Sequence, residues 1–255
     1  MDLSLQSNLT PINAWLPGRR VSFVKPDKEW LTQQYMQDLL EDEFWELTER
    51  VWDYTALSIT ALYNLYRSCR FIIDNRIDGD IIECGVFFGG AIMFAAEIFR
   101  RHDYAKSRRI LGFDTFYGFA RRSEHDIDFH GAEVCHPGNP EWDFEKEARR
   151  NVESIGFDPS RLHLIKGDVF QTLPAFIDRP IALLRLDTDT YDTTKCELET
   201  CWPKLVDNAP VIIDDYGWCL GARKATDDFL IGKGVLLHRI DVTVRSFVKP
   251  CLTAR

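Results

Sequence analysis

The sequence lacks any apolar segment long enough to cross a membrane. Its longest uncharged apolar stretch, Cys84 to Ala96, is well short of the roughly 20 residues that a membrane-spanning helix needs. The N-terminus shows no succession of basic, apolar and small residues of the kind that marks a secretory signal peptide. We therefore expect a cytoplasmic protein that does not insert into a membrane.

Cysteine pairs at metal-ligand spacing and an excess of positive charge are also absent. The seven cysteines form no CxxC motif, so free thiols are expected rather than disulfides or a zinc site. The chain has 31 Lys and Arg against 40 Asp and Glu, which gives a formal net charge of -9. This balance disfavours nonspecific attraction to phosphate or anionic lipid, so neither nucleic acid nor a membrane is an expected partner.

Short apolar runs alternate with helical segments after residue 79. Strands are predicted at 81–84, 109–113, 162–165, 182–186 and 211–213, with a helix at 91–100. Because these runs are almost continuously hydrophobic, the strands are expected to be parallel and covered on both faces. Two more strands, at 234–239 and 243–248, complete a doubly wound α/β sheet of Rossmann type, mostly parallel with an antiparallel C-terminal strand.

The rest of the chain divides into an arm, a helical region and an insertion. Residues 1–26 predict an irregular arm that could pack on a neighbouring subunit, and residues 27–78 predict helices, with helical spacing over 27–52 and a second helix over 54–74. The core then spans 79–255. A polar insertion at about 115–160, with a helix over 141–155, follows a strand's carboxyl end and is expected to cover a site as a lid.

Two groups of carboxylates directly follow two of the predicted strands. Asp187 and Asp189 come after one strand, and Asp214 and Asp215 come after another. Carboxylates at buried strand ends resist ionisation unless a cation or hydrogen-bond donors compensate them. If the two strands are neighbours, Asp187 and the second pair converge, and their oxygens suit Mg²⁺, Ca²⁺ or Mn²⁺ rather than zinc. For Asp189, capping of the following helix is the alternative.

A glycine-containing turn follows the first predicted strand of the core. The segment IIECGVFFGG over 81–90 leads from a strand into a helix. Gly85 permits a sharp turn, and Gly89 permits close approach of the helix N-terminus to a ligand. Glu83 precedes the first glycine by two residues, so the spacing differs from the GxGxxG of dinucleotide-binding proteins. Tight packing without a ligand is the alternative interpretation.

Two further carboxylates occupy successive strand ends. Asp114 closes the predicted strand 109–113, where a carboxylate can accept hydrogen bonds from both hydroxyls of a ribose. Asp168 lies shortly after the strand 162–165, near the expected position of an adenine. Either residue could instead be a helix cap or a turn residue.

Taken together, these motifs resemble the macrocin O-methyltransferase family. The resemblance extends from about residue 55 to 229 and is carried by GDIIECG over 79–85, FDTFYGF over 113–119, RLDTDTYDTT over 185–194, WPKL over 202–205 and VIIDDYG over 211–217. It implies a class I S-adenosylmethionine-dependent methyltransferase fold and an enzyme that methylates a hydroxyl of a sugar or glycosylated natural product. It also implies a divalent metal such as Mg²⁺ and a homo-oligomer.

The resemblance assigns roles by position. It implies metal ligands at Asp187, Asp214 and Asp215, a general base at Asp189, a cofactor loop with Glu83, Gly85 and Gly89, a ribose contact at Asp114 and an adenine-side residue at Asp168. The chain has Thr188 and Thr190 where the family's usual RLDGDLY pattern has Gly and Leu, which leaves the shape of the acceptor open.

Two other functions remain open from the sequence. The DxD formed by Asp187 and Asp189 also occurs in metal-dependent nucleotide-sugar glycosyltransferases, although these need neither the glycine loop nor a second acidic pair. A noncatalytic binding module with the same fold is the third hypothesis. It would be marked by loss of the loop or of the acidic residues, and both are present.

Overall fold

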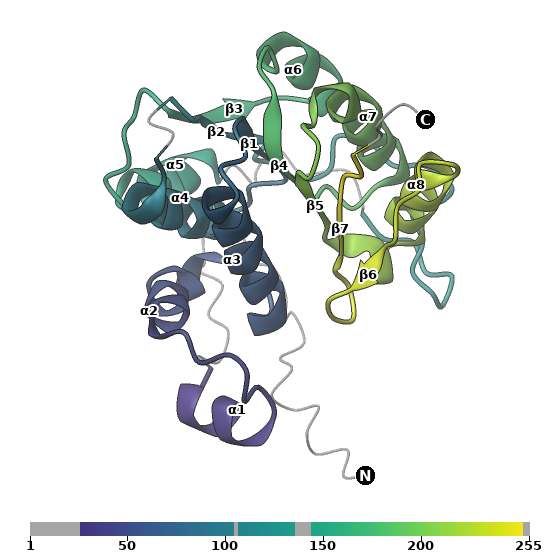
Figure 1. Cartoon of the computed structure of the whole chain (residues 1–255). Helices are drawn as coiled ribbons and strands as arrows, with labels where there is room; N and C mark the ends of the chain where they lie inside the picture. Colours follow the sequence, from purple (N-terminus) through teal and green to yellow (C-terminus); the bar gives the residue numbers. More distant parts are fainter. Residues whose placement is uncertain (1–25, 105–106, 136–143, 252–255) are drawn as a thin grey trace.

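The computed structural model describes residues 26–104, 107–135 and 144–251, and this part of the chain contains one seven-stranded sheet (Figure 1). The strands are β1 Asp80–Cys84, β2 Ile110–Asp114, β3 Leu162–Lys166, β4 Ile181–Leu186, β5 Pro210–Ile213, β6 His238–Arg239 and β7 Arg245–Val248. Their order is β3-β2-β1-β4-β5-β7-β6, with β1 to β5 parallel and β7 antiparallel to both neighbours. The predicted doubly wound α/β sheet is confirmed.

Helices cover both faces of this sheet (Figure 1). The α-helices are α1 Lys28–Gln34, α2 Asp42–Val51, α3 Ile59–Asp74, α4 Gly90–His102, α5 Glu145–Glu153, α6 Val169–Phe176, α7 Tyr191–Cys201 and α8 Leu220–Leu230. Successive strand residues point to opposite faces. Ile81 therefore packs in the core with α2 to α5, whereas Ile82 packs in the second core with α6 and α7. Among the described residues, no helix is long and apolar enough to span a membrane.

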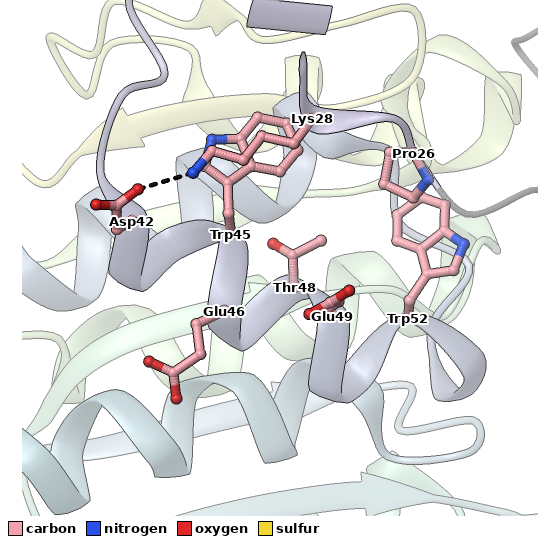
Figure 2. Close-up of a pocket in the computed structure, with 8 residues that line it drawn as sticks. All are labelled: Pro26, Lys28, Asp42, Trp45, Glu46, Thr48, Glu49 and Trp52. Carbon is pink, nitrogen blue, oxygen red and sulfur yellow. Dashed lines mark hydrogen bonds and ion pairs between the residues drawn. The ribbon is translucent and has the colours of Figure 1, made fainter. Parts of the chain in front are cut away.

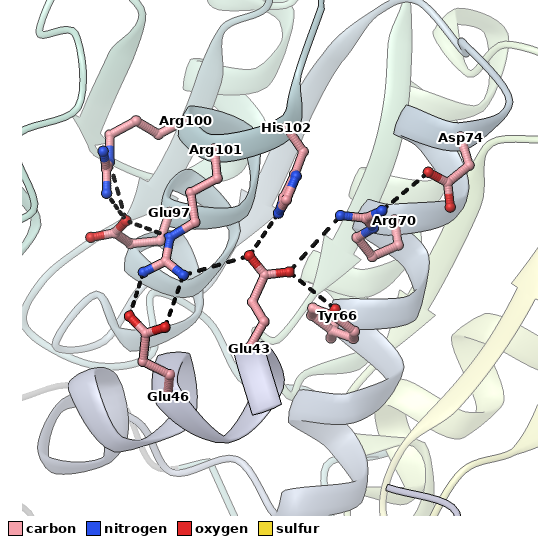
Figure 3. A network of polar contacts seen from close by, with 9 residues as sticks. All are labelled: Glu43, Glu46, Tyr66, Arg70, Asp74, Glu97, Arg100, Arg101 and His102. Atoms are coloured by element: carbon pink, nitrogen blue, oxygen red, sulfur yellow. Dashed lines mark hydrogen bonds and ion pairs between the residues drawn. The ribbon is translucent and has the colours of Figure 1, made fainter. Parts of the chain in front are cut away.

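The N-terminal helices pack on α4 through aromatic and polar contacts. Phe44 of α2 lies 5.1 Å from Tyr63 and 6.1 Å from Phe94, measured between ring centroids. Glu43 joins three helices (Figure 3), because its carboxylate lies 2.6 Å from His102 Nε2 and accepts a hydrogen bond of 3.1 Å from the Tyr66 hydroxyl. The N-terminal helical region is thus attached to the rest of the fold through α4.

The continuous helical spacing predicted over 27–52 is interrupted in the structure. Residues between α1 and α2 form turns, and the indole N–H of Trp45 donates to the carbonyl of Leu39 at 2.7 Å, which a continuous helix would not leave available. The helix predicted to start at Tyr54 starts at Ile59, because Ser58 caps it by accepting a hydrogen bond from the Ala61 N–H. Both differences lie at boundaries, where side-chain caps decide more than periodicity does.

Two other predicted elements are shorter in the structure than the sequence predicts. The strand predicted over 234–239 is limited to His238–Arg239, and Leu236 before it is 73% exposed. Of the helix predicted over 141–155, the residues 141–143 lie outside the described part, and α5 covers Glu145–Glu153. The arm predicted over 1–26 lies outside the described part except for residue 26.

The strand order locates the site. The chain leaves β1 towards β2 on one side, while β4 pairs with β1 on the other side. In open α/β sheets ligands bind at such a switch point, outside the carboxyl ends of the strands. In this fold, the segment after β1 and the segment after β4 meet there.

Candidate active site

The acidic groups that follow β4 and β5 lie side by side. Leu186 is paired with Ile213 in the parallel ladder, and the N–H of Asp214 donates to the carbonyl of Leu186 at 2.9 Å. One carboxylate oxygen from each of Asp187, Asp214 and Asp215 lies within 4.8 Å of the other two. The structure therefore brings together the three residues predicted as metal ligands.

A buried arginine lies among these carboxylates. The Arg185 side chain is 4% exposed, and its guanidinium donates to Glu83 Oε1 and to Asp214 Oδ2 and lies 2.8 Å from Asp187 Oδ2. These carboxylates keep its pKa well above the usual value although burial alone would lower it. Arg185 is absent from the predicted site residues, and the signal for it was an arginine inside an otherwise apolar strand, which must be paired when buried.

Burial raises the pKa of several carboxyl groups at this edge. For Asp214 and Asp215 the pKa lies well above its usual range, first because of burial and then because carboxylates surround each group. Burial likewise raises the pKa of Asp189 to about 7, although a hydrogen bond with Asp215 lowers it. Two carboxyl groups can share a hydrogen bond only if one carries the proton, so the cluster attracts protons and cations.

Asp189 occupies a strained position beside the cluster. Its φ of 66° lies in the left-handed region, which few residues other than glycine adopt, and Asp and Asn do so more readily than most. Thr190, and not Asp189, is the N-cap of α7, and its side chain accepts a hydrogen bond from the Thr193 N–H. Because Asp189 does not cap the helix, its carboxyl group is available to face Asp215.

The glycine turn after β1 touches the acidic segment after β4. Gly85 has a φ of 88°, and a Cβ atom there would lie 1.9 Å from the carbonyl oxygen of Asp187. Gly89, with a φ of 91°, precedes α4, and a Cβ atom there would lie 2.6 Å from Val152 of α5. Tight packing thus explains Gly89, whereas Gly85 allows the predicted cofactor loop to reach the acidic edge.

The remaining residues predicted to bind a cofactor differ in their contacts. Asp114 accepts hydrogen bonds from three backbone N–H groups, those of Val86 at 2.7 Å, Phe87 at 2.9 Å and Phe116 at 2.7 Å. It therefore fastens the glycine turn to the end of β2. Glu83 is 3% exposed, and its Oε2 has no hydrogen-bond partner among the described residues.

Asp168 lies at the start of α6. It accepts a hydrogen bond of 3.1 Å from the Phe170 N–H and pairs with Arg121 at 3.1 Å. The Arg121 guanidinium also lies 3.9 Å from the centroid of the Phe170 ring. The alternative interpretation, a helix cap, describes Asp168 in this structure, and a contact to adenine stays a prediction.

The described part of the insertion is fastened to the same end of the sheet. Asp126 is fully buried and accepts hydrogen bonds from Ser123 at 2.6 Å and from the N–H of Tyr191 at 2.7 Å. A Cβ atom at Gly221 would lie 1.9 Å from Asp126 Oδ1. Asp126 thus joins the insertion to the start of α7 and to α8.

A surface pocket of about 230 Å³ lies elsewhere, on the N-terminal helices (Figure 2). The side chains of Trp45 and Trp52 flank it, and Asp42 pairs with Lys28 at its rim. Its other lining residues are Pro26, Glu46, Thr48 and Glu49. No predicted site residue lines this pocket, so the acidic edge and not the pocket is the candidate active site.

Known proteins share both the sequence pattern and the fold. Residues 47–249 match the family model described as Macrocin-O-methyltransferase (TylF). A demethyldecarbamoylnovobiocin O-methyltransferase from Streptomyces niveus is 29% identical over 177 residues, 69% of this chain and 67% of that protein. An 8-demethyl-8-(2,3-dimethoxy-alpha-L-rhamnosyl)-tetracenomycin-C 4'-O-methyltransferase from Streptomyces olivaceus is 30% identical over 165 residues, 64% of this chain and 62% of that protein.

A solved structure of a related protein has the same fold. The O-methyltransferase NovP superposes with a TM-score of 0.67 at 27% identity, covering 78% of this chain and 83% of that one. The predicted resemblance is confirmed, since the family match spans most of the sequence. With the glycine turn and the acidic edge at the switch point of its sheet, this chain belongs to the macrocin O-methyltransferase family.

Proposed function

We propose that this protein transfers the methyl group of S-adenosylmethionine to a hydroxyl group of a sugar on a natural product, with a divalent metal such as Mg²⁺ at the acidic edge. The relatives support the reaction class, and the Streptomyces olivaceus enzyme is named for a substrate that carries a rhamnosyl group. The observation that carries the proposal is the convergence of Asp187, Asp214 and Asp215 within 4.8 Å beside the glycine turn.

The charges at this edge fit a metal ion. Carboxyl groups are contributed by five residues, and the Arg185 guanidinium contacts three of them, Glu83, Asp187 and Asp214. The other two carboxyl groups are those of Asp189 and Asp215. Asp215 Oδ2 is buried without a hydrogen-bond partner in that same part of the chain. Buried carboxylate oxygens require compensation, and an all-oxygen donor set suits Mg²⁺ or Mn²⁺. When bound, such an ion would polarise neighbouring oxygens of the acceptor.

The loop after β1 fits S-adenosylmethionine, which would supply the methyl group. Gly85 allows this turn to lie against the carbonyl of Asp187, and Asp114 fixes the turn by its three backbone hydrogen bonds. Glu83 has one buried oxygen without a partner at the same strand end. We propose that Glu83, Gly85, Gly89 and Asp114 line the cofactor site, with Asp168 at its adenine end.

Asp189 is the proposed general base. It lies next to the proposed metal ligands, and its pKa of about 7, raised by burial, suits a group that accepts a proton near neutral pH. The left-handed backbone at this residue keeps its carboxyl group on the acidic edge and away from the N-terminus of α7. Asp189 would take the proton of the acceptor hydroxyl when its oxygen receives the methyl group, and the bond between that methyl carbon and sulfur would break so that S-adenosylhomocysteine leaves.

The base assignment is tested by replacing Asp189 with Asn. Loss of a general base typically costs about 10²- to 10⁴-fold in rate, so kcat should fall by at least about 100-fold. Affinity for S-adenosylhomocysteine, measured by calorimetry, should stay within about threefold of the unmodified protein, because Asp189 does not line the cofactor loop. Asp192→Asn is the matched control, since Asp192 lies in the first turn of α7 outside the cluster.

Two results would contradict this function. Full activity of Asp189→Asn would remove the base assignment. Calorimetric binding of nucleoside diphosphates with Mg²⁺, without binding of S-adenosylhomocysteine, would instead favour the glycosyltransferase hypothesis.

A further inference from the structure

A further buried acid, Glu197, lies next to the segment 187–190 that follows β4. Glu197 of α7 is fully buried. Its Oε1 lies 2.8 Å from the Thr188 hydroxyl, and its Oε2 has no hydrogen-bond partner among the residues that the structure describes. The thiols of Cys84 and Cys201 are near it and offer only weak hydrogen bonds. Burying a carboxyl group with so few hydrogen-bond partners costs free energy of folding. Its one strong hydrogen bond, with Thr188, therefore indicates where Glu197 acts.

The contact continues as a chain of hydroxyl groups. Thr188 Oγ1 lies 2.7 Å from Thr193 Oγ1, which in turn lies 2.7 Å from Thr190 Oγ1. Thr193 Oγ1 also lies 3.3 Å from the carbonyl of Thr190 and 3.4 Å from that of Thr188. Glu197 is therefore linked through side chains to Thr188 and Thr190, two of the four residues that precede α7, and to Thr193 in the first turn of that helix.

The linked residues surround the proposed chemistry. Thr188 lies between Asp187 and Asp189, and the N–H of Thr190 donates to the Thr188 carbonyl at 2.7 Å across Asp189. This tight turn places Asp189 at its positive φ, a conformation that persists only when neighbouring contacts impose it.

The position of the chain of hydroxyls argues against a purely structural role. The N–H of Asp187 donates to the carbonyl of Cys84 at 2.8 Å, and its carboxylate lies 2.8 Å from Arg185. The residues after Asp187 are held by the side-chain hydrogen bonds of Thr188, Thr190 and Thr193. Glu197 lies at the buried end of this chain of hydrogen bonds. Groups that orient ligand residues in this way typically change metal affinity or activity by 10- to 100-fold when removed.

We propose that Glu197 is a positioning residue that holds Thr188, and through it the segment 187–189, in the geometry that metal binding and proton transfer require. This inference rests on the proposed metal-dependent function. It assigns to Glu197 no contact with the metal, the cofactor or the acceptor.

The experiment measures Mn²⁺ affinity by electron paramagnetic resonance of free Mn²⁺ in four variants, Glu197→Ala, Glu197→Gln, Thr188→Ala and the Glu197→Ala/Thr188→Ala double variant. Glu197→Ala and Thr188→Ala should each weaken binding by about tenfold or more. The double variant should be no weaker than the single ones beyond about twofold, because both remove the same contact. Glu197→Gln keeps the hydrogen bond and should stay within about threefold of the unmodified protein.

The matched control is Glu199→Ala, which removes a Glu of the same helix whose side chain is 57% exposed. It should leave Mn²⁺ affinity unchanged. Amide hydrogen exchange of the metal-free proteins adds a second readout, in which the segment 187–190 should exchange faster in Glu197→Ala and Thr188→Ala than in Glu197→Gln. If Glu197→Ala does not fold, Thr188→Ala and Glu197→Gln still decide the matter.

Unchanged Mn²⁺ affinity and unchanged exchange in Thr188→Ala would overturn the inference, as would additive losses in the double variant. If the unmodified protein binds S-adenosylhomocysteine but no Mn²⁺, the proposed metal dependence fails, and with it the part of this inference that concerns metal binding. That case is distinguishable, because the exchange measurement on the metal-free variants still reports whether Glu197 holds the segment.

Discussion

The carboxyl groups at the ends of β4 and β5 differ in their contacts. Asp187 and Asp214 contact Arg185, whereas Asp189 contacts Asp215 through a hydrogen bond between their carboxyl groups. The first two are therefore partly neutralised by a fixed cation. The second pair is not, which is consistent with a proton or a metal ion as its compensation.

The buried acid behind this edge makes stability depend on pH. Burial raises the pKa of Glu197 from its ordinary 4.5 to about 8, a net value that includes a decrease from the Thr188 hydrogen bond and an increase from the nearby charge of Asp187. Between these two pH values the folded protein keeps a proton that the unfolded chain has lost. The contribution of this group to folding is therefore complete below about pH 4.5 and is lost as pH rises towards 8.

Replacing Glu197 with Gln should remove this dependence. The variant and the unmodified protein should have similar free energies of unfolding near pH 4.5, and the variant should be more stable by roughly 3 to 5 kcal/mol at pH 8. Urea unfolding at a series of pH values measures this difference, in which the titration of all other groups cancels. A difference that stays constant between pH 5 and pH 8 would show that Glu197 is ionised in the folded protein.

At the residue scale, the sequence predicted which residues lie at the strand ends better than it predicted which side chains contact each other. The convergence of Asp187, Asp214 and Asp215 follows from their places at the ends of neighbouring parallel strands. Arg185 and Glu197 could not be assigned in the same way. Their roles depend on which side chains meet across the sheet and across α7, and a charged residue in an amphipathic helix is usually at the surface.

At the scale of elements, polar contacts join the N-terminal helices to the sheet layer. Glu43 of α2 contacts Tyr66 of α3 and His102 of α4 (Figure 3). Burial alone would raise the pKa of Glu43, but hydrogen bonding and charge from His102, with contributions from Tyr66 and Arg101, lower it overall. Its stabilising contribution is thus present well above pH 4.5 and is lost as pH falls through the lowered pKa.

Replacing Glu43 with Ala should lower the free energy of unfolding by about 1 to 2 kcal/mol at neutral pH, because a partly buried carboxylate with several charged partners is lost. The control is Glu46→Ala, because the Glu46 side chain is 57% exposed and pairs with Arg101, and this variant should lose less stability than Glu43→Ala. Urea unfolding measures both. Equal losses in the two variants, or a loss that does not shrink in acid, would contradict this role.

Element types were more predictable than element ends. The apolar runs identified the five parallel strands, because parallel strands are covered on both faces and have nearly continuous hydrophobicity. The helix boundaries depended on local contacts such as the Ser58 cap and the Trp45 bond to Leu39. Asp126 was equally unpredictable, since its burial results from contacts with the distant starts of α7 and α8.

For the whole molecule, topology places the site. The strand order puts β1 and β4 next to each other at the switch point, so the glycine turn and the acidic edge meet although about 100 residues separate them in the sequence. Membership of the macrocin O-methyltransferase family agrees with this arrangement. The identity of the acceptor does not follow from topology, because loops and insertions outside the sheet determine it.

The most direct test of the proposed function is methyl transfer from S-adenosylmethionine to a panel of glycosides and nucleotide sugars, followed by mass spectrometry before and after chelation of divalent metal. We predict that at least one sugar-containing acceptor gains a single methyl group, that chelation abolishes the gain, and that added Mg²⁺ or Mn²⁺ restores it. Methyl transfer that continues at an undiminished rate after complete chelation would contradict a metal-dependent site at Asp187, Asp214 and Asp215.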